Sequence, residues 1–127
     1  MKRLRVLVVE DEPLLREIYV ESLKDEGIEN VSEADNGIIA IEKLRNEKFD
    51  LIISDYLMPH ANGGEVYLFN KTNSNIPFIL ISATDTSFFP EFYDYQKTNP
   101  LNLSLMKPLK TELLLSHLQK ILEEIRK

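Results

Sequence analysis

The chain has 127 residues, which predicts a single domain over residues 1–127 that is large enough to bury a hydrophobic core. Its net charge of -6 argues against a nucleic-acid-binding surface, and no apolar run is long enough to span a membrane. The absence of cysteine excludes disulfides, thiolate metal sites and thiol nucleophiles, and it fits a cytoplasmic location.

The first half of the chain alternates strand-like and helical stretches. An apolar run at residues 4–9 predicts a strand, and Pro13 suits the first turn of the following helix because its nitrogen needs no partner there. Gly27 can end that helix in the left-handed conformation. We expect a second strand at residues 30–34 and a third at 51–54, separated by a helix whose apolar positions are Ile38, Ile41 and Leu44.

The second half continues this alternation. A short third helix is expected after Gly64, a fourth strand at residues 78–82 and a fifth at residues 101–106. The final helix is the clearest, with an apolar face formed by Leu114, Leu118, Ile121, Leu122 and Ile125. Leu-Ile-Ile in the third expected strand and Phe-Ile-Leu-Ile in the fourth are continuous rather than alternating, which suits parallel strands buried on both faces. The whole pattern predicts an α/β protein with a parallel sheet, right-handed crossovers and helices on both sides.

Acidic and polar residues follow the ends of several expected strands. These residues are Glu10 and Asp11 after the first strand, Asp55 after the third, Ser82 at the end of the fourth and Lys107 after the fifth. Each residue type alone is common in turns, in caps or on surfaces. Because the carboxyl ends of parallel strands share one edge of a sheet, however, we expect all five side chains to meet there.

Three carboxylates, a hydroxyl and an ammonium can together support phosphoryl transfer. Crowded carboxylates repel one another, and a hard cation such as Mg²⁺ relieves that cost. The acidic loop would repel a bare phosphate, so the metal has to bind first. Asp55 can then attack as a nucleophile and become an acyl phosphate. Lys107 precedes Pro108, and X-Pro bonds can be cis, so Pro108 is a candidate cis-proline.

The motifs around these residues resemble those of response-regulator receiver domains of two-component signalling, particularly the stand-alone chemotaxis regulators. The resemblance covers essentially the whole chain and rests on Val-Leu-Val-Val-Glu-Asp-Glu, on Asp55 with Met58-Pro59, on Asn62-Gly63-Gly64, on Ile81-Ser82-Ala83 and on Met106-Lys107-Pro108. It implies a flavodoxin-like, doubly wound, five-stranded parallel sheet of order 2-1-3-4-5 with five helices.

The resemblance also implies a role for each residue of the site. Asp55 would be the phosphoacceptor, and the Mg²⁺ ligands would be Asp55, Asp11, the backbone carbonyl of Leu57 and, through water, Glu10. The phosphoryl-binding and switch residues would be Ser82, Ala83 and Lys107. The donor would be a phosphohistidine on a histidine kinase or histidine phosphotransfer protein. A downstream protein target would dock on the face from the fourth to the fifth helix, and the domain would catalyse only its own phosphorylation and dephosphorylation.

The sequence departs from the family pattern between the fourth strand and Lys107. Ser104 occupies the position of a switch aromatic, and Pro100-Leu101-Asn102 replaces a usual Gly-Ala pair. Residues 88–95 are rich in aromatics and contain Pro90, so we expect a fourth helix that is short, shifted or irregular. The aromatics either pack inward as a local cluster or form an exposed partner patch. We hypothesise that switching survives without a ring at position 104, but weaker or through another aromatic.

Two other functions fit parts of the pattern. A degenerate receiver could act as a constitutive protein-interaction module, although the intact acids, Ser82 and Lys107 favour a working phosphoacceptor. A metal-dependent hydrolase of similar topology is the other candidate. Haloacid-dehalogenase-like phosphatases need a second Asp two residues after the nucleophile, and Leu57 occupies that position here.

Overall fold

A single parallel sheet forms the centre of the computed structural model, which describes residues 3–87 and 89–127. Its strands are β1 (Arg5–Val9), β2 (Asn30–Ala34), β3 (Leu51–Asp55), β4 (Phe78–Ser82) and β5 (Leu103–Met106). They lie in the order β2-β1-β3-β4-β5, and every neighbouring pair is parallel. The predicted flavodoxin-like topology is therefore confirmed.

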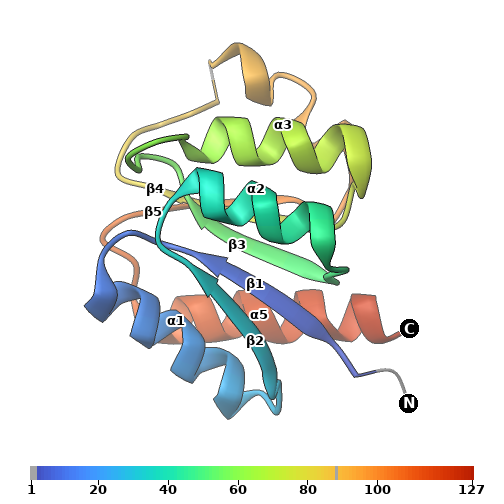
Figure 1. Cartoon of the computed structure of the whole chain (residues 1–127). Coiled ribbons are helices and arrows are strands. Elements are labelled where there is room, and N and C mark those ends of the chain that lie inside the picture. The colour runs from blue at the N-terminus through green and yellow to red at the C-terminus, as the bar shows by residue number, and fades with distance from the viewer. Residues whose placement is uncertain (1–2, 88) are drawn as a thin grey trace.

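Helices cover both faces of this sheet, as Figure 1 shows. They are α1 (Pro13–Asp25), α2 (Gly37–Asn46), α3 (Gly63–Asn73), α4 (Tyr95–Thr98) and α5 (Thr111–Arg126), with a 3-10 turn, η1 (Pro90–Phe92), before α4. Helices α1 and α5 lie on one face, and α2 and α3 lie on the other. The fourth helix is short and irregular, as its Pro90 predicts. No helix of the described residues is both long and apolar enough to cross a bilayer.

Each face of the sheet has its own hydrophobic core. Val6 and Val8 of β1 pack with α1 and α5, whereas Leu7 and Val9 pack with α2 and α3. Successive strand residues point to opposite faces, so a strand buried on both sides must be apolar at every position. This requirement explains the continuous apolar runs of β1, β3 and β4, the three inner strands of the sheet.

The fifth strand begins at Leu103, two residues later than the sequence predicts, because Asn102 forms side-chain hydrogen bonds outside the β5 ladder. The Asn102 side chain is buried, accepts a hydrogen bond of 2.9 Å from the Phe78 backbone N–H and donates one of 2.7 Å to the Tyr95 carbonyl. Its own backbone N–H donates to the Asn99 carbonyl in a turn. Asn102 thus connects the start of β4 to α4, and pairing of β5 with β4 starts only after it.

Replacing Asn102 with alanine should lower the free energy of unfolding by about 2–4 kcal/mol, because the Phe78 N–H and the Tyr95 carbonyl would lose buried partners. Urea unfolding measures this loss. The matched control is Asn46→Ala, at the exposed end of α2, where we expect a change within about 0.5 kcal/mol. Equal effects of the two substitutions would contradict this role for Asn102.

Most of the described aromatics between β4 and β5 pack inward. Phe92 and Tyr95 are buried, and their rings lie 5.7 Å apart and contact Tyr67 at 5.3 and 5.1 Å. Phe89 is half-buried, whereas Tyr93 is 80% exposed. Phe88 lies outside the described residues. The inward cluster is therefore the better of the two interpretations, with Tyr93 as its exception.

Candidate functional site

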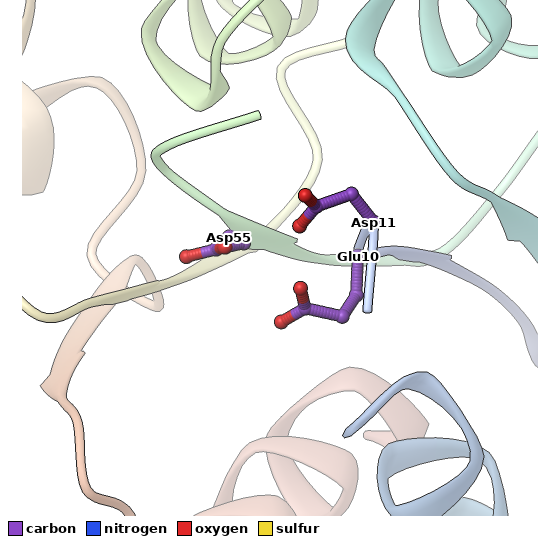
Figure 2. A group of neighbouring side chains, drawn as sticks. All are labelled: Glu10, Asp11 and Asp55. Atoms are coloured by element: carbon purple, nitrogen blue, oxygen red, sulfur yellow. The ribbon is translucent and has the colours of Figure 1, made fainter. Parts of the chain in front are cut away.

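Three carboxylates meet at the carboxyl edge of the sheet. Glu10 and Asp11 directly follow β1, and Asp55 is the last residue of β3, the strand paired beside β1. Oxygen atoms of the three carboxylates all lie within 4.8 Å of one another. Figure 2 shows Glu10 and Asp11 extending from the end of β1 toward the same region as Asp55. Adjacent strands in register thus unite acids that are far apart in the sequence.

Burial makes negative charge costly at this site. Glu10 and Asp55 are buried, whereas Asp11 is exposed. Burial, reinforced by the nearby Asp55 charge, raises the pKa of Glu10 to about 7, although a hydrogen bond from the Glu12 backbone and the Lys107 charge oppose the rise. Burial also raises the pKa of Asp55, against the opposing charge of Lys107. The cluster would consequently gain from a bound cation.

Lys107 supplies one positive charge to the acids. Its Nζ lies 3.2 Å from Asp55 Oδ2 and 3.3 Å from Glu10 Oε1. Burial alone would lower the pKa of Lys107, but the Asp55 and Glu10 charges outweigh it, so the pKa is raised and the ammonium stays charged. Its backbone N–H donates to the Ser82 carbonyl at 2.8 Å, and the following peptide bond to Pro108 is cis.

The remaining candidate residues lie around these charges. Ser82 is buried at the end of β4, next to β3, and its Oγ accepts a hydrogen bond of 3.0 Å from the Thr84 N–H. Ala83 follows it in an exposed position. Leu57 is 78% exposed, and because its hydrocarbon side chain has no ligand atom, any contribution to a metal site would come through its backbone carbonyl.

The loop after Asp55 is held close to the end of β3. The Tyr56 backbone N–H lies 2.9 Å from Asp55 Oδ1 and 3.1 Å from the Ile81 carbonyl, so the two oxygens share this donor. The Gly63 N–H donates to the Tyr56 carbonyl at 2.6 Å. A β-carbon at Gly63 would collide with the Asp55 carbonyl oxygen, so the close approach of α3 to the site requires glycine.

Sequence reasoning missed Arg16, which supports the acidic loop from α1. Its Nη1 donates to the Glu10 carbonyl at 2.8 Å, and its Nε lies 3.1 Å from the Glu33 carboxylate on β2. Nothing in the helix periodicity distinguishes Arg16 from other surface cations. Only the folded arrangement of β1, β2 and α1 shows that it positions the backbone of Glu10.

The carboxylates of the cluster fit a magnesium ion in donor type. Mg²⁺ prefers hard oxygen ligands and is bound in proteins by one or two carboxylates, with water and phosphate oxygens completing its shell. Glu10, Asp11 and Asp55 supply carboxylate oxygens within reach of one another, and Asp11 is open to solvent. The raised pKa of Glu10 agrees with a buried charge that Lys107 alone does not fully compensate.

Comparisons with known proteins agree with this geometry. A family model described as the response regulator receiver domain matches residues 6–119. A probable transcriptional regulatory protein of Picosynechococcus sp. is 39% identical over 87 residues, which are 62% of this chain and 34% of that protein. A protein-glutamate methylesterase/protein-glutamine glutaminase of Desulfotalea psychrophila is 43% identical over 88 residues, 68% of this chain and 24% of that protein. The chain thus spans a minor part of the length of both curated relatives.

A solved structure shares both the fold and part of the sequence. The response regulator protein TrrA from Thermotoga maritima, in complex with Mg(2+)-BeF, is 28% identical to this chain. The two structures superpose with a TM-score of 0.76 over 93% of this chain and 98% of the other.

Proposed function

The chain belongs to the response regulator receiver domain family of two-component systems, and from this premise we propose that Asp55 is its phosphoacceptor. The phosphoryl donor would be a phosphohistidine on a histidine kinase or histidine phosphotransfer protein. The observation that carries the proposal is the convergence of the Glu10, Asp11 and Asp55 carboxylates with the Lys107 ammonium at one edge of the sheet. A cytoplasmic location stays a prediction.

In the proposed reaction, an Asp55 carboxylate oxygen attacks the phosphorus of the phosphohistidine. The new O–P bond forms as the P–N bond breaks, and the imidazole nitrogen leaves with the bonding electron pair and takes up a proton. The product on this chain is an acyl phosphate. Negative charge increases on the phosphoryl oxygens, so a fixed positive charge beside Asp55 lowers the barrier. Lys107, 3.2 Å from Asp55 Oδ2, would supply that charge, while Ser82 and Ala83 would contact the phosphoryl oxygens.

A magnesium ion would be held by Asp11, Asp55 and the Leu57 carbonyl, with Glu10 acting through water. When bound, it would neutralise charge on the carboxylates and on the incoming phosphoryl oxygens. Arg16 keeps the backbone of this loop in place through the Glu10 carbonyl. Asp55 would thus serve both as a ligand of the cation and as the reacting group, whereas Asp11, the exposed acid of the three, would serve only as a ligand.

Phosphorylation would change the surface offered to a downstream protein, on the face that runs from α4 to α5. On this proposal the domain has no external substrate to convert and promotes only the gain and loss of its own phosphoryl group. The methylesterase relative is much longer than this chain, which agrees with its activity residing in another domain.

Acetyl phosphate with Mg²⁺, read by intact mass, tests the proposal. Wild-type protein should gain the mass of one phosphoryl group, and Asp55→Asn should gain none because an amide cannot act as the nucleophile. Asp35→Asn, which removes an exposed carboxylate that follows β2, should be modified like the wild type. EDTA should prevent modification of all variants. If the wild type gained no mass, the proposal would be abandoned in favour of a constitutive interaction module.

A further inference from the structure

The residue after Asp55 connects the candidate site to the irregular segment between β4 and β5. The Tyr56 hydroxyl donates a hydrogen bond of 3.2 Å to Glu91 Oε1, in the 3-10 turn η1. The centroid of its ring lies 5.2 Å from that of Phe89 and 5.8 Å from that of Phe92. One side chain therefore contacts three residues of the turn and its flank.

The backbone of the same residue responds to the chemistry of Asp55. The Tyr56 N–H lies within hydrogen-bond distance of both Asp55 Oδ1 and the Ile81 carbonyl. A hydrogen bond to a carboxylate is stronger than one to a neutral carbonyl. When Asp55 becomes an acyl phosphate, one of its oxygens joins the phosphorus and the other becomes a neutral carbonyl. The Tyr56 N–H would then favour the Ile81 carbonyl, and a rotation of this peptide would move the Tyr56 side chain.

Other side chains in this region are poorly placed to transmit such a change. Ser104 carries no ring, and the Tyr95 hydroxyl is fixed to the sheet by hydrogen bonds of 2.6 and 2.8 Å to the carbonyls of Phe78 and Leu103. Among the described residues, a cavity of about 240 Å³ lined by Ser82, Ser104, Phe92 and Tyr95, among others, lies between the sheet and the η1–α4 segment. This space gives the segment room to shift.

The far end of the segment is anchored to α3. Asp94 forms an ion pair with Lys71 and accepts a hydrogen bond of 3.1 Å from the Tyr67 hydroxyl. Between this anchor at Asp94 and the hydrogen bond of Tyr56 at Glu91 lie Phe92 and the largely exposed Tyr93. With Asp94 held in place, a change at Tyr56 would act on residues 89–93 and would alter how Tyr93 is presented to solvent.

We propose that Tyr56 is a positioning residue that transmits the phosphorylation state of Asp55 to residues 89–93, through its hydrogen bond to Glu91 and its ring contacts with Phe89 and Phe92. The η1 turn is accordingly the part of the surface that phosphorylation rearranges. This inference rests on the proposed function of Asp55. In this proposal a different aromatic, Tyr56, takes the part of the ring that position 104 lacks.

Amide chemical shifts of the full chain, measured with Mg²⁺ before and after addition of beryllium fluoride, test the inference. In the wild type, the amides of Asp55, Ser82 and Lys107 should shift, and those of residues 91–93 should shift with them. In Tyr56→Phe, which removes only the hydroxyl, the site amides should respond as before, and the shifts at residues 91–93 should fall to less than half. Glu91→Ala removes the acceptor and should have the same effect as Tyr56→Phe. The double variant should add nothing further.

The matched control is Tyr93→Phe, which removes a hydroxyl from an exposed ring of the same segment and should leave the response of the 91–92 amides unchanged. Full shifts at residues 91–93 in both Tyr56→Phe and Glu91→Ala would overturn the relay and leave the phosphoacceptor intact. The relay would also be overturned if, in the wild type, the site amides shifted and the amides of residues 91–93 did not. No shift at Asp55, Ser82 or Lys107 in the wild type would overturn the proposed function, and the relay with it.

Discussion

Glu10→Gln should stabilise the metal-free protein at pH 8, by on the order of 1–3 kcal/mol. The wild-type carboxylate is fully buried, close to Asp55 and Asp11, and its pKa is raised to about 7. At pH 8 it is ionised in an environment that disfavours the charge. Glutamine keeps the shape and can still accept the hydrogen bond from the Glu12 backbone, which is 3.2 Å in the wild type. Urea unfolding in EDTA measures the difference.

The pH dependence of stability should differ between the two proteins as well. The Glu10 pKa rises from 4.5 to about 7 on folding, so between these values the folded state holds a proton that the unfolded state has lost. The contribution of Glu10 to stability therefore falls as the pH rises through this window and is constant above it. Glu10→Gln removes this contribution, so its unfolding free energy in EDTA should decline less than that of the wild type from pH 5 to pH 8.

Magnesium should stabilise the wild type more than it stabilises Glu10→Gln. A cation that neutralises the cluster should stabilise the wild type at pH 8, and should stabilise Glu10→Gln less because one carboxylate is gone. Glu17→Gln, which removes an exposed acid of α1, is the matched control and should behave like the wild type in every condition. A Glu10→Gln protein less stable than wild type in EDTA at pH 8 would show that Lys107 compensates the buried charge fully.

Lys107→Met should slow phosphorylation by acetyl phosphate roughly 100-fold, the loss typical of removing one preorganised electrostatic group. The ammonium lies 3.2 Å from Asp55 Oδ2 and 3.3 Å from Glu10 Oε1, and methionine keeps the chain length without the charge. Magnesium affinity, by contrast, should increase in Lys107→Met. Lys107 competes with the metal for the same carboxylates, so its removal should tighten Mg²⁺ binding roughly tenfold, or about 1.4 kcal/mol.

These two opposed effects separate a specific role of Lys107 from general damage to the fold. A misfolded variant would lose both metal binding and phosphorylation. Lys110→Met removes an exposed cation from the same loop and should leave both quantities near their wild-type values. Calorimetric titration with Mg²⁺ and the rate of mass gain are the two measurements. Weaker magnesium binding by Lys107→Met, together with slower phosphorylation, would contradict the role given to this lysine.

The fold could be predicted from the sequence because burial on both faces of a strand leaves a local pattern. The apolar run at residues 78–82 coincides with β4, which is buried throughout, and Pro13 begins α1 as its chemistry requires. The strand predicted at residues 30–34 coincides with β2, although this edge strand is only partly buried. The start of β5 could not be predicted in this way. Leu101 and Asn102 fit the strand-like alternation that continues to Met106, and only the hydrogen bonds of Asn102 to Phe78 and Tyr95 exclude them from the strand.

The grouping of the candidate site residues could also be inferred before the structure was known. Parallel strands carry their ends to one edge, so acids after two strands and a lysine after a third had to lie near one another. Contacts made by side chains of irregular segments follow no such rule. Arg16 on the Glu10 carbonyl and Tyr56 on Glu91 join residues with no shared periodicity, and sequence reasoning identified neither.

The amino-acid sequence by itself determined the β-α alternation, the sheet it builds and the edge at which the charged residues gather, because hydrophobic periodicity and strand direction are local properties of a chain. The tertiary structure alone decided how charge is balanced among Glu10, Asp55 and Lys107, and which aromatic of the β4–β5 connection lies against Tyr56. These features depend on distances of a few ångströms between segments far apart in sequence, and no local pattern encodes such distances.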